Sequence, residues 1–456
     1  MAIPLEPPDS EPRSALSRLV RLALPIVGLN TLSVLALTVD TAMCGRLPDA
    51  KDALTALGFS TQIVYIMIIV VTGLSIGAAS LTARAHGAGQ PERAERVLGQ
   101  GIVLVVIVSV GVALVGNLFG PVLLAALGAE GPLIELAMQY LAPMMTFVFF
   151  QYLSLFFAAV LRGIGNTRLP FFIAIVVNVA NFGLNYGLIL GNYGLPSLGV
   201  RGAAYGTVIA YAIGVTIYLA VFLRGSLGIR LRLSTLRPDG KLVGTIARVG
   251  TPAALDVATL NVALASLVSM VGRIEQVAVG AHGLGIRVQG LAYVPGFAVS
   301  QATAAMVGQA LGARDIAGAR SATKVGVGVC TALMAVLAFS IYFAAEPIVS
   351  AFDVAAGSRL EVLSVEWIRQ LGLCMPLVGV YVSFIGALQG AGATMTGLYI
   401  NVAVTLAFQL PLSWLLGFPL GFGVVGVWWA FPLSFVPKAV ASWLAYRRGK
   451  WARVGL

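Results

Sequence analysis

Two acidic side chains, Asp40 and Asp256, lie deep inside long apolar stretches of the sequence. A carboxylate at the centre of a membrane helix costs about 2.5 to 3.5 kcal/mol on insertion scales, so its presence there indicates a function. In an apolar site such an acid can bind and release a proton near neutral pH, or pair with a cationic substrate. Asp40, in LTVDTAMCGRL, is therefore predicted to be the protonation and coupling site. The alternative is a carboxylate that caps backbone and hydroxyl groups, including those of Thr38 and Thr41.

Asp256 has a basic residue at a similar depth. Counted from the turn at Arg273, Asp256 lies 17 residues back and Arg287 lies 14 residues forward on the next helix. At 1.5 Å per residue, the two side chains differ in height by roughly 4.5 Å. Asp256 is thus either a second coupling residue or one half of a structural ion pair with Arg287.

Three amides, Asn178, Asn181 and Asn185, share one face of a predicted helix because they are spaced by three and four residues. Amides in a membrane helix must find hydrogen-bond partners. Asn181 and Asn185 are expected to contact the Asp40 carboxylate or a substrate. The alternative is that they only join neighbouring helices.

A proline and several bulky side chains complete the set of candidates. Pro25 lies fifteen residues before Asp40; because a proline removes one backbone hydrogen bond and permits a kink, it is predicted to be a conformational hinge. The predicted substrate chamber is lined by Met43, Tyr140, Phe147, Phe149, Tyr152, Asn178 and Arg287. The alternative for the bulky members of this set is packing in the protein core or against lipid.

The amino-acid composition indicates the class of protein that contains these residues. Of 456 residues, 59% are hydrophobic and 10% are charged, whereas soluble domains carry about 25% charge. This excludes a soluble enzyme. The three cysteines and two histidines lie far apart in the sequence. We therefore expect no metal site, no catalytic triad and no cofactor. The acidic, proline-rich start is unlike a cleaved signal peptide and is interpreted as a cytoplasmic tail.

Long apolar runs separated by charged or Gly/Pro-rich breaks predict an all-α membrane protein with twelve transmembrane helices. The alternating polarity of a membrane β-barrel is missing from the sequence. The predicted helices are 21–45, 55–83, 97–119, 132–161, 169–191, 202–223, 242–272, 276–309, 319–345, 360–388, 396–417 and 425–446.

Orientation follows from the 29 basic residues, of which 21 fall on the side of the N-terminal tail. Cytoplasmic loops retain Lys and Arg, so both termini are predicted to be cytoplasmic in a multi-pass protein of the cell membrane, such as a bacterial inner membrane. A surplus spread over successive loops sets topology and contacts anionic lipid. Nucleic acid is not expected as a partner.

The sequence also contains an internal repeat. Five segments of the first half reappear in the same order in the second half at offsets of 224 to 227, for example LRGIGNT and LQGAGAT. Such parallel repeats are typical of transporters that expose one site alternately to each side. The predicted divisions are a tail 1–20, a first lobe 21–223, a basic linker 224–241, a second lobe 242–446 and a tail 447–456.

Several motifs together resemble the multidrug and toxic compound extrusion (MATE) family, and its DinF branch in particular. They are LALPIVGLNTLSVLALTVDTAMCGRL, GAGQPERAERV, LRGIGNTRLP, NVANFGLNYGLILG, PSLGVRGAAYGT and VGQALGARDIAGAR, within about residues 15 to 446. The resemblance implies a V-shaped pair of six-helix lobes, no enzymatic activity, and cation-coupled export of organic, often cationic, compounds by a monomer.

Site roles also follow from the resemblance. Asp40 matches the carboxylate on which proton coupling centres, and Asn181 and Thr207 match polar residues near it. The family often has Asp where this chain has Asn185, and its NorM branch has an acid where this chain has Leu260. Proton coupling is therefore expected over sodium coupling. Another possibility is a flippase for lipid-linked precursors, which would need a cationic cavity; a major-facilitator carrier and a passive channel are less consistent with the motifs.

Overall fold

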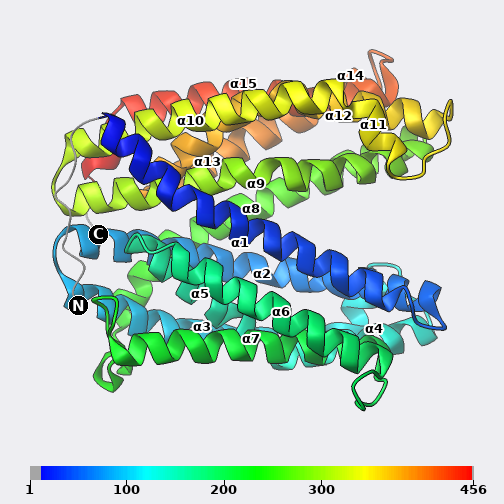
Figure 1. Cartoon of the computed structure of the whole chain (residues 1–456). Helices are drawn as coiled ribbons and strands as arrows, with labels where there is room; N and C mark the ends of the chain where they lie inside the picture. The colour runs from blue at the N-terminus through cyan, green and yellow to red at the C-terminus, as the bar shows by residue number, and fades with distance from the viewer. Residues whose placement is uncertain (1–11, 454–456) are drawn as a thin grey trace. The chain divides into compact units, whose positions relative to one another are not determined.

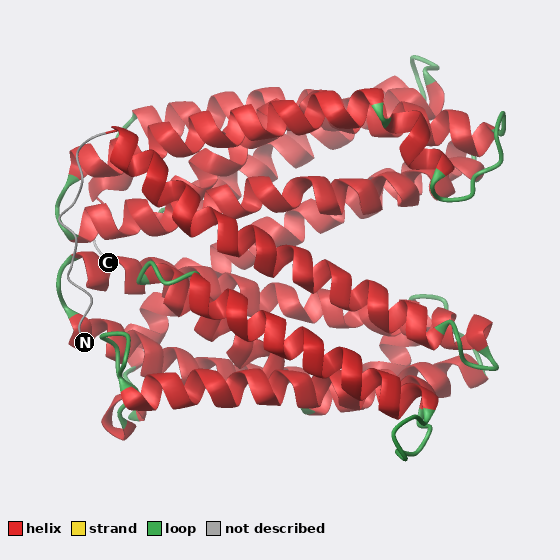
Figure 2. Cartoon of the chain, viewed as in Figure 1, coloured by secondary structure: helices red, strands yellow, loops and turns green. Residues whose placement is uncertain are grey.

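The computed structural model describes residues 12–453, and within that range all regular structure is helical, without strands (Figures 1 and 2). Residues 1–11 and 454–456, parts of the two predicted tails, lie outside the described residues. The α-helices are α1 (Pro12–Cys44), α2 (Ala50–Gly87), α3 (Pro91–Ala126), α4 (Pro132–Thr146), α5 (Val148–Gly163), α6 (Arg168–Leu190), α7 (Gly199–Arg224), α8 (Gly240–Ile274), α9 (Val277–Gly312), α10 (Ile316–Phe343), α11 (Ala345–Ser350), α12 (Arg359–Gly390), α13 (Thr394–Val404), α14 (Leu410–Gly417) and α15 (Gly423–Arg447). Three short elements complete the set: the 3-10 helices η1 (Leu233–Leu236) and η3 (Lys450–Arg453) and the π-helix η2 (Thr405–Gln409).

Every predicted apolar run coincides with helical structure, so the all-α membrane class is confirmed. Two runs are interrupted. The run 132–161 forms α4 and α5, which meet at Phe147 with a bend of 52°, four residues after Pro143, whose ring removes a backbone donor. The run 396–417 forms α13, η2 and α14.

Of the twelve predicted membrane-spanning helices, up to eleven are long and apolar enough in the described structure to cross a membrane. Ten described helices are long and apolar enough to cross a membrane, and the bent pair α4 and α5 makes up to eleven. The remaining predicted span is α9, a helix of 36 residues. It contains His282, Arg287 and Gln289, and these polar side chains lower its hydropathy.

The described residues divide into two compact units. Unit 1 is Gly28–Ala254, and unit 2 joins Leu255–Leu456 to the start of α1, up to Val27. The predicted lobes were divided at a loop, whereas this division runs through α1 and α8. In each helix it falls two residues after a proline, Pro25 or Pro252. The first turns of α1 therefore pack in unit 2, through Leu19, Leu22 and Ile26.

One of the two histidines, His282, is part of the hydrophobic core of unit 2. His282 is fully buried and stacks on Trp367, with ring centroids 5.1 Å apart. Trp428 Nε1 donates a hydrogen bond to His282 Nδ1 at 3.0 Å. His282 is thus an aromatic core residue, held by stacking and one hydrogen bond.

In unit 1 the segment between α7 and α8 is fastened to α3. Gln100 Nε2 donates to the carbonyl oxygens of Thr235 and Arg237, and Gln100 Oε1 accepts from the Asp239 amide. One turn earlier, Glu95 accepts a hydrogen bond from the Arg230 amide. The basic linker is therefore part of unit 1 rather than a free tether.

Candidate functional site

The Asp40 carboxylate is the centre of a hydrogen-bonded group formed by α1, α6 and α7, all within unit 1. Asp40 is 5% exposed. Asn185 Nδ2 donates to Asp40 Oδ1 at 2.5 Å, and Thr207 Oγ1 lies 3.5 Å from Asp40 Oδ2 as a second, longer donor. Asn181 Nδ2 donates to Thr207 Oγ1 at 3.1 Å. The structure thus brings together four of the predicted site residues, and among the described hydrogen bonds Asn181 is linked to Asp40 through Thr207.

The alternative role for Asp40, as a cap of local hydroxyl groups, finds less support in the geometry. Thr38 Oγ1 donates to the Val34 carbonyl one turn earlier in the same helix. The donors of Asp40 come instead from α6 and α7.

Close approach of the three helices depends on two glycines. A Cβ on Gly206 would lie 2.0 Å from Asn185 Oδ1, so only glycine lets this amide fit against α7. A Cβ on Gly28 would lie 2.4 Å from the ring of Phe171, so α1 and α6 are in contact just after Pro25. Sequence analysis missed Gly206; its only signal was the run of small residues in RGAAYGT.

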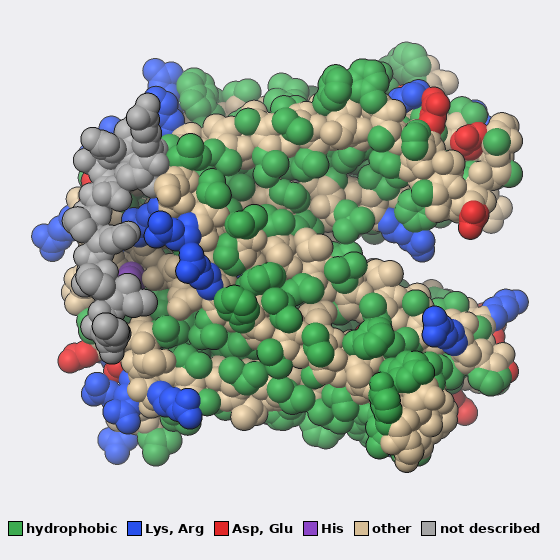
Figure 3. All heavy atoms as spheres, viewed as in Figure 1, with side chains coloured by type: hydrophobic (Ala, Val, Ile, Leu, Met, Phe, Trp, Pro, Cys, Tyr) green, Lys and Arg blue, Asp and Glu red, His purple; other side chains and the backbone are tan. Residues whose placement is uncertain are grey.

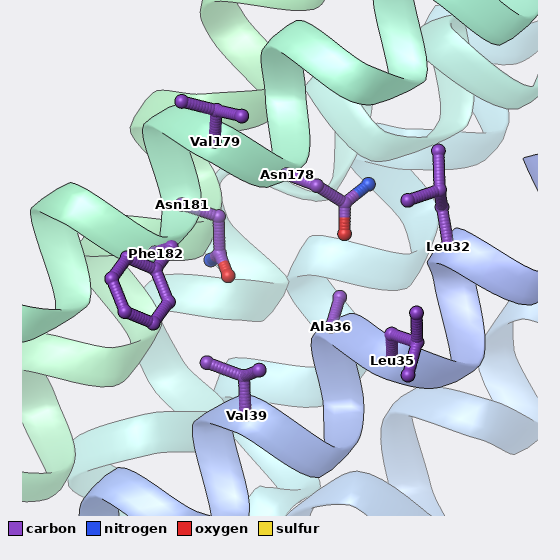
Figure 4. Close-up of a pocket in the computed structure, with 8 residues that line it drawn as sticks. All are labelled: Leu32, Leu35, Ala36, Val39, Asn178, Val179, Asn181 and Phe182. Atoms are coloured by element: carbon purple, nitrogen blue, oxygen red, sulfur yellow. The ribbon is translucent and has the colours of Figure 1, made fainter.

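A pocket of about 230 Å³ lies between α1 and α6, beside the Asp40 group (Figure 4). Figure 4 shows Asn178 and Asn181 extending from α6 among apolar side chains. Asn178 Nδ2 is bonded to the Ala174 carbonyl, and its oxygen faces Ala36. The lining residues are Leu32, Leu35, Ala36, Val39, Asn178, Val179, Asn181 and Phe182.

Asn181 belongs both to this pocket and to the Asp40 group. A molecule in the pocket would therefore be linked to the carboxylate by the chain Asn181, Thr207, Asp40. All lining side chains are uncharged. Such a surface suits an apolar or amphiphilic molecule better than a pyrophosphate group, which would need basic residues.

Most of the predicted chamber residues lie elsewhere in the described structure. Met43, Tyr140 and Tyr152 are buried in the core, and the Tyr152 hydroxyl donates to the Met67 carbonyl at 2.6 Å. Phe147 is at the bend between α4 and α5. Of the predicted set, only Asn178 lines the α1–α6 pocket.

The ion pair between Asp256 and Arg287, one of the two alternatives for Asp256, does not form among the described residues. The three salt bridges among the described residues join Arg232 to Glu95, Arg359 to Glu275 and Arg369 to Glu346. The contact that the structure gives Asp256 is with α13, where Asn401 Nδ2 donates to the Asp256 backbone carbonyl at 3.1 Å. Equal depth was a poor guide because the Arg287 side chain is exposed.

Lys438 is buried, although its position predicts otherwise. A lysine nine residues from Arg447, near the end of α15, is placed to extend toward the membrane surface, but Lys438 is 1% exposed. Among the described residues, no group of three or more His, Cys, Asp or Glu side chains has the geometry of a metal site.

The chain is similar to known proteins over almost its whole length. The MatE family model matches residues 25–187 and 252–415, which are the two halves of the repeat. The probable multidrug resistance protein NorM of Thermotoga maritima is 25% identical over 98% of this chain and 95% of its own. The multidrug resistance protein NorM of Burkholderia vietnamiensis is 27% identical over 92% of this chain and 91% of its own.

Solved structures show the same fold. A transporter of the MOP superfamily from Pyrococcus furiosus superposes with a TM-score of 0.89 at 21% identity, covering 97% of both chains. The MATE transporter VcmN of Vibrio cholerae superposes with a TM-score of 0.88 at 23% identity, covering 96% of this chain and 97% of its own. With the family model matched over both halves, this chain belongs to the MatE family and is a membrane transporter, not an enzyme.

Proposed function

We propose that this protein is a DinF-like, proton-coupled antiporter that exports organic cationic or amphiphilic compounds, with Asp40 as the coupling residue. The observation that carries the proposal is the buried Asp40 carboxylate, bonded to Asn185 and Thr207 and adjacent to an apolar pocket. The relatives are named as multidrug resistance proteins, which supports the substrate class. We further propose that it acts as a monomer in a bacterial inner membrane, with both termini cytoplasmic.

Competition for one carboxylate explains exchange. When Asp40 is ionised, its charge favours a cationic substrate in the neighbouring pocket, and Asn181 with Thr207 connects the two positions. When Asp40 takes up a proton, that attraction is lost and the substrate leaves. Pro25 removes a backbone hydrogen bond in α1, which lets the segment carrying Asp40 shift relative to the first turns of the helix. The protonated carrier then returns to the inner side.

The energy available is set by the stoichiometry. A gradient of one pH unit supplies about 1.36 kcal/mol per proton, which supports a tenfold substrate gradient. Exchange of one proton for one monovalent cation moves no net charge. Membrane potential therefore adds nothing to the drive of a one-for-one exchanger.

The test is efflux from proteoliposomes containing the purified protein, driven separately by a proton gradient and by a sodium gradient over a panel of cationic dyes. Asp40→Asn removes the titrating group and keeps a similar shape, so we expect loss of proton-driven efflux with the unfolding temperature unchanged. Asp52→Asn, which neutralises an exposed acid at the start of α2, is the matched control and should transport normally. Normal efflux by Asp40→Asn would refute the mechanism. Efflux driven by sodium but not by protons would refute the choice of coupling ion.

A further inference from the structure

The pocket between α1 and α6, which lies wholly within unit 1, has two polar groups in its wall. They are the carboxamides of Asn178 and Asn181, and the other lining side chains are apolar. The two amides lie three residues apart on α6, so they are neighbours on one face, with Cβ atoms about 5 to 6 Å apart. A ligand in the pocket is therefore recognised by the atoms that these two amides present to it.

Hydrogen bonding fixes the orientation of both amides. A backbone carbonyl can only accept, so the Asn178 atom that lies 2.7 Å from the Ala174 carbonyl oxygen is its nitrogen. The Thr207 hydroxyl gives its hydrogen to the ionised Asp40 carboxylate and therefore accepts from Asn181, whose Nδ2 lies 3.1 Å away. Each amide nitrogen is thus bonded within unit 1, and each amide oxygen is left over.

Both amide oxygens lack a donor. Among the hydrogen bonds of residues 12–453, none ends on Asn178 Oδ1 or Asn181 Oδ1. Asn178 Oδ1 faces Ala36 on the opposite wall, where the small side chain leaves room for another group (Figure 4). An amide oxygen without a hydrogen bond in apolar surroundings is costly. A ligand that supplies N–H donors removes this cost, whereas a ligand without donors does not.

The dimensions of the pocket limit what it takes in. Its volume of about 230 Å³ is below the volume of about 300 to 1,000 Å³ that is typical of pockets for drug-sized molecules. Leu35, Val179 and Phe182 line the pocket and are exposed, so the cavity is open on one side. A bound molecule thus places its polar head beside the amides and leaves part of its apolar body outside.

We propose that this pocket selects organic cations that carry N–H groups, namely protonated amines, over quaternary ammonium ions, and that Asn178 is the residue that discriminates between them. The N–H groups of a protonated amine donate to the two amide oxygens. A quaternary ion has the same charge but no donor, so it leaves both oxygens unpaired, and sites built for a hydrogen bond reject such analogues strongly. The inference rests on the proposed function, because it narrows the class of cation that the substrate pocket accepts.

The experiment compares two probes that differ only at nitrogen, naphthylmethylammonium and its N,N,N-trimethyl derivative. Equilibrium dialysis of the purified full-length protein in detergent, at a mildly alkaline pH, measures the dissociation constant of each probe, with protein-free detergent as the blank. Both probes carry one positive charge and the same ring system, so an ionised Asp40 attracts them alike. We expect the ammonium probe to bind at least about tenfold more tightly, which corresponds to one hydrogen bond made by a charged donor.

Asn178→Leu removes one acceptor and keeps a side chain of similar size. We expect it to lower the ratio of the two affinities about three- to tenfold by weakening only the ammonium probe. Asn117→Leu is the matched control. Asn117 Nδ2 also donates to the carbonyl four residues earlier, at 2.8 Å from Ala113, but Asn117 lies on α3 and does not line the pocket. Its substitution should leave the ratio unchanged.

Equal affinities of the two probes for the unaltered protein would overturn the proposal, and so would the absence of binding by either probe. A folded Asn178→Leu variant that keeps the full ratio would also contradict it. If Asn178→Leu fails to fold, Asn178→Ala removes the same oxygen and decides by the same ratio. Binding at equilibrium requires no transport, and the probes have equal charge, so the result stands whether or not Asp40 proves to be the coupling residue.

Discussion

At the scale of single residues, the Asp40 group depends on the missing side chain of Gly206. Gly206→Ala would place a Cβ 2.0 Å from Asn185 Oδ1, so the amide must turn away from the carboxylate while the helices stay in place. A hydrogen bond to a charged group contributes about 1.5 to 3 kcal/mol. If that contribution is made in the rate-limiting state, proton-driven efflux falls about ten- to hundredfold.

The matched control for this substitution is Gly183→Ala, on α6 itself, where an added Cβ would point into open space. Both substitutions gain the same helix propensity, about 0.5 to 1 kcal/mol relative to glycine. Any difference between them in efflux therefore measures the contact with Asn185. Equal efflux by the two variants, in the proteoliposome assay, would show that the Asn185 bond is dispensable.

At the scale of elements, one ion pair joins the end of α8 to the start of α12 outside the spanning segments. Arg359 Nε donates to Glu275 Oε1 and Arg359 Nη2 donates to Glu275 Oε2, both at 2.9 Å. This hydrogen bonding, together with the charge of Arg359, holds the pKa of Glu275 below its ordinary value of 4.5. Ser358 caps the N-terminus of α12 by accepting from the Glu361 amide, which fixes the helix start that presents Arg359.

The sign of the resulting pH dependence follows from the lowered pKa. Ionised Glu275 stabilises the fold, so the contribution is complete above pH 4.5 and is lost as pH falls through the lowered value. For a solvent-exposed pair it amounts to about 0.2 to 1 kcal/mol. Arg359→Gln should therefore unfold more easily than the unaltered protein at neutral pH, with the difference vanishing in acid. Denaturant titrations in detergent at several pH values measure it.

The control for the pair is Arg273→Gln, an exposed arginine in the last turn of α8 that takes part in none of the three salt bridges of the described residues. Its stability should differ from that of the unaltered protein by the same small amount at every pH. A constant difference for Arg359→Gln as well would mean that Glu275 gains nothing from the arginine.

Element positions were predictable where burial in lipid alone decides them. Each long apolar run became a helix, because a backbone in hydrocarbon must satisfy its own hydrogen bonds. The bend at Phe147 and the π-helix before Pro411 were not predicted, because one wide or broken turn leaves the apolar run unchanged. The burial of Lys438 was missed because depth along a helix does not say which way a side chain points.

At the scale of the whole molecule, the repeat is conserved in helices but not in charge. The first half contains the Asp40 group, an acid with amide and hydroxyl donors, whereas the repeat offset of 227 places Leu267 at the position of Asp40 in the second half. The duplicated fold therefore keeps this acid in one half only. Such an arrangement would limit coupling to a single proton per cycle.

Orientation in the membrane is the last property of the whole molecule to be predicted. On the face visible in Figure 3, both signs of charge appear at both ends, and Lys and Arg are more numerous at the end where α1 begins. Because cytoplasmic loops retain basic residues, that end is expected inside the cell. The predicted orientation can be tested at the two ends of α7. Its 26 residues span about 39 Å at 1.5 Å per residue, so the two ends are expected on opposite sides of the membrane.

Ser197 precedes α7 and Ser226 follows it, and both are exposed. The native cysteines, Cys44, Cys330 and Cys374, are buried and should give little background labelling. In intact spheroplasts a membrane-impermeant maleimide should label Ser197→Cys, and it should label Ser226→Cys only after permeabilisation. The opposite pattern would invert the topology and place the fastened basic linker outside. In that case the surplus of Lys and Arg would reflect something other than orientation, and the direction of transport proposed for Asp40 would have to be reversed.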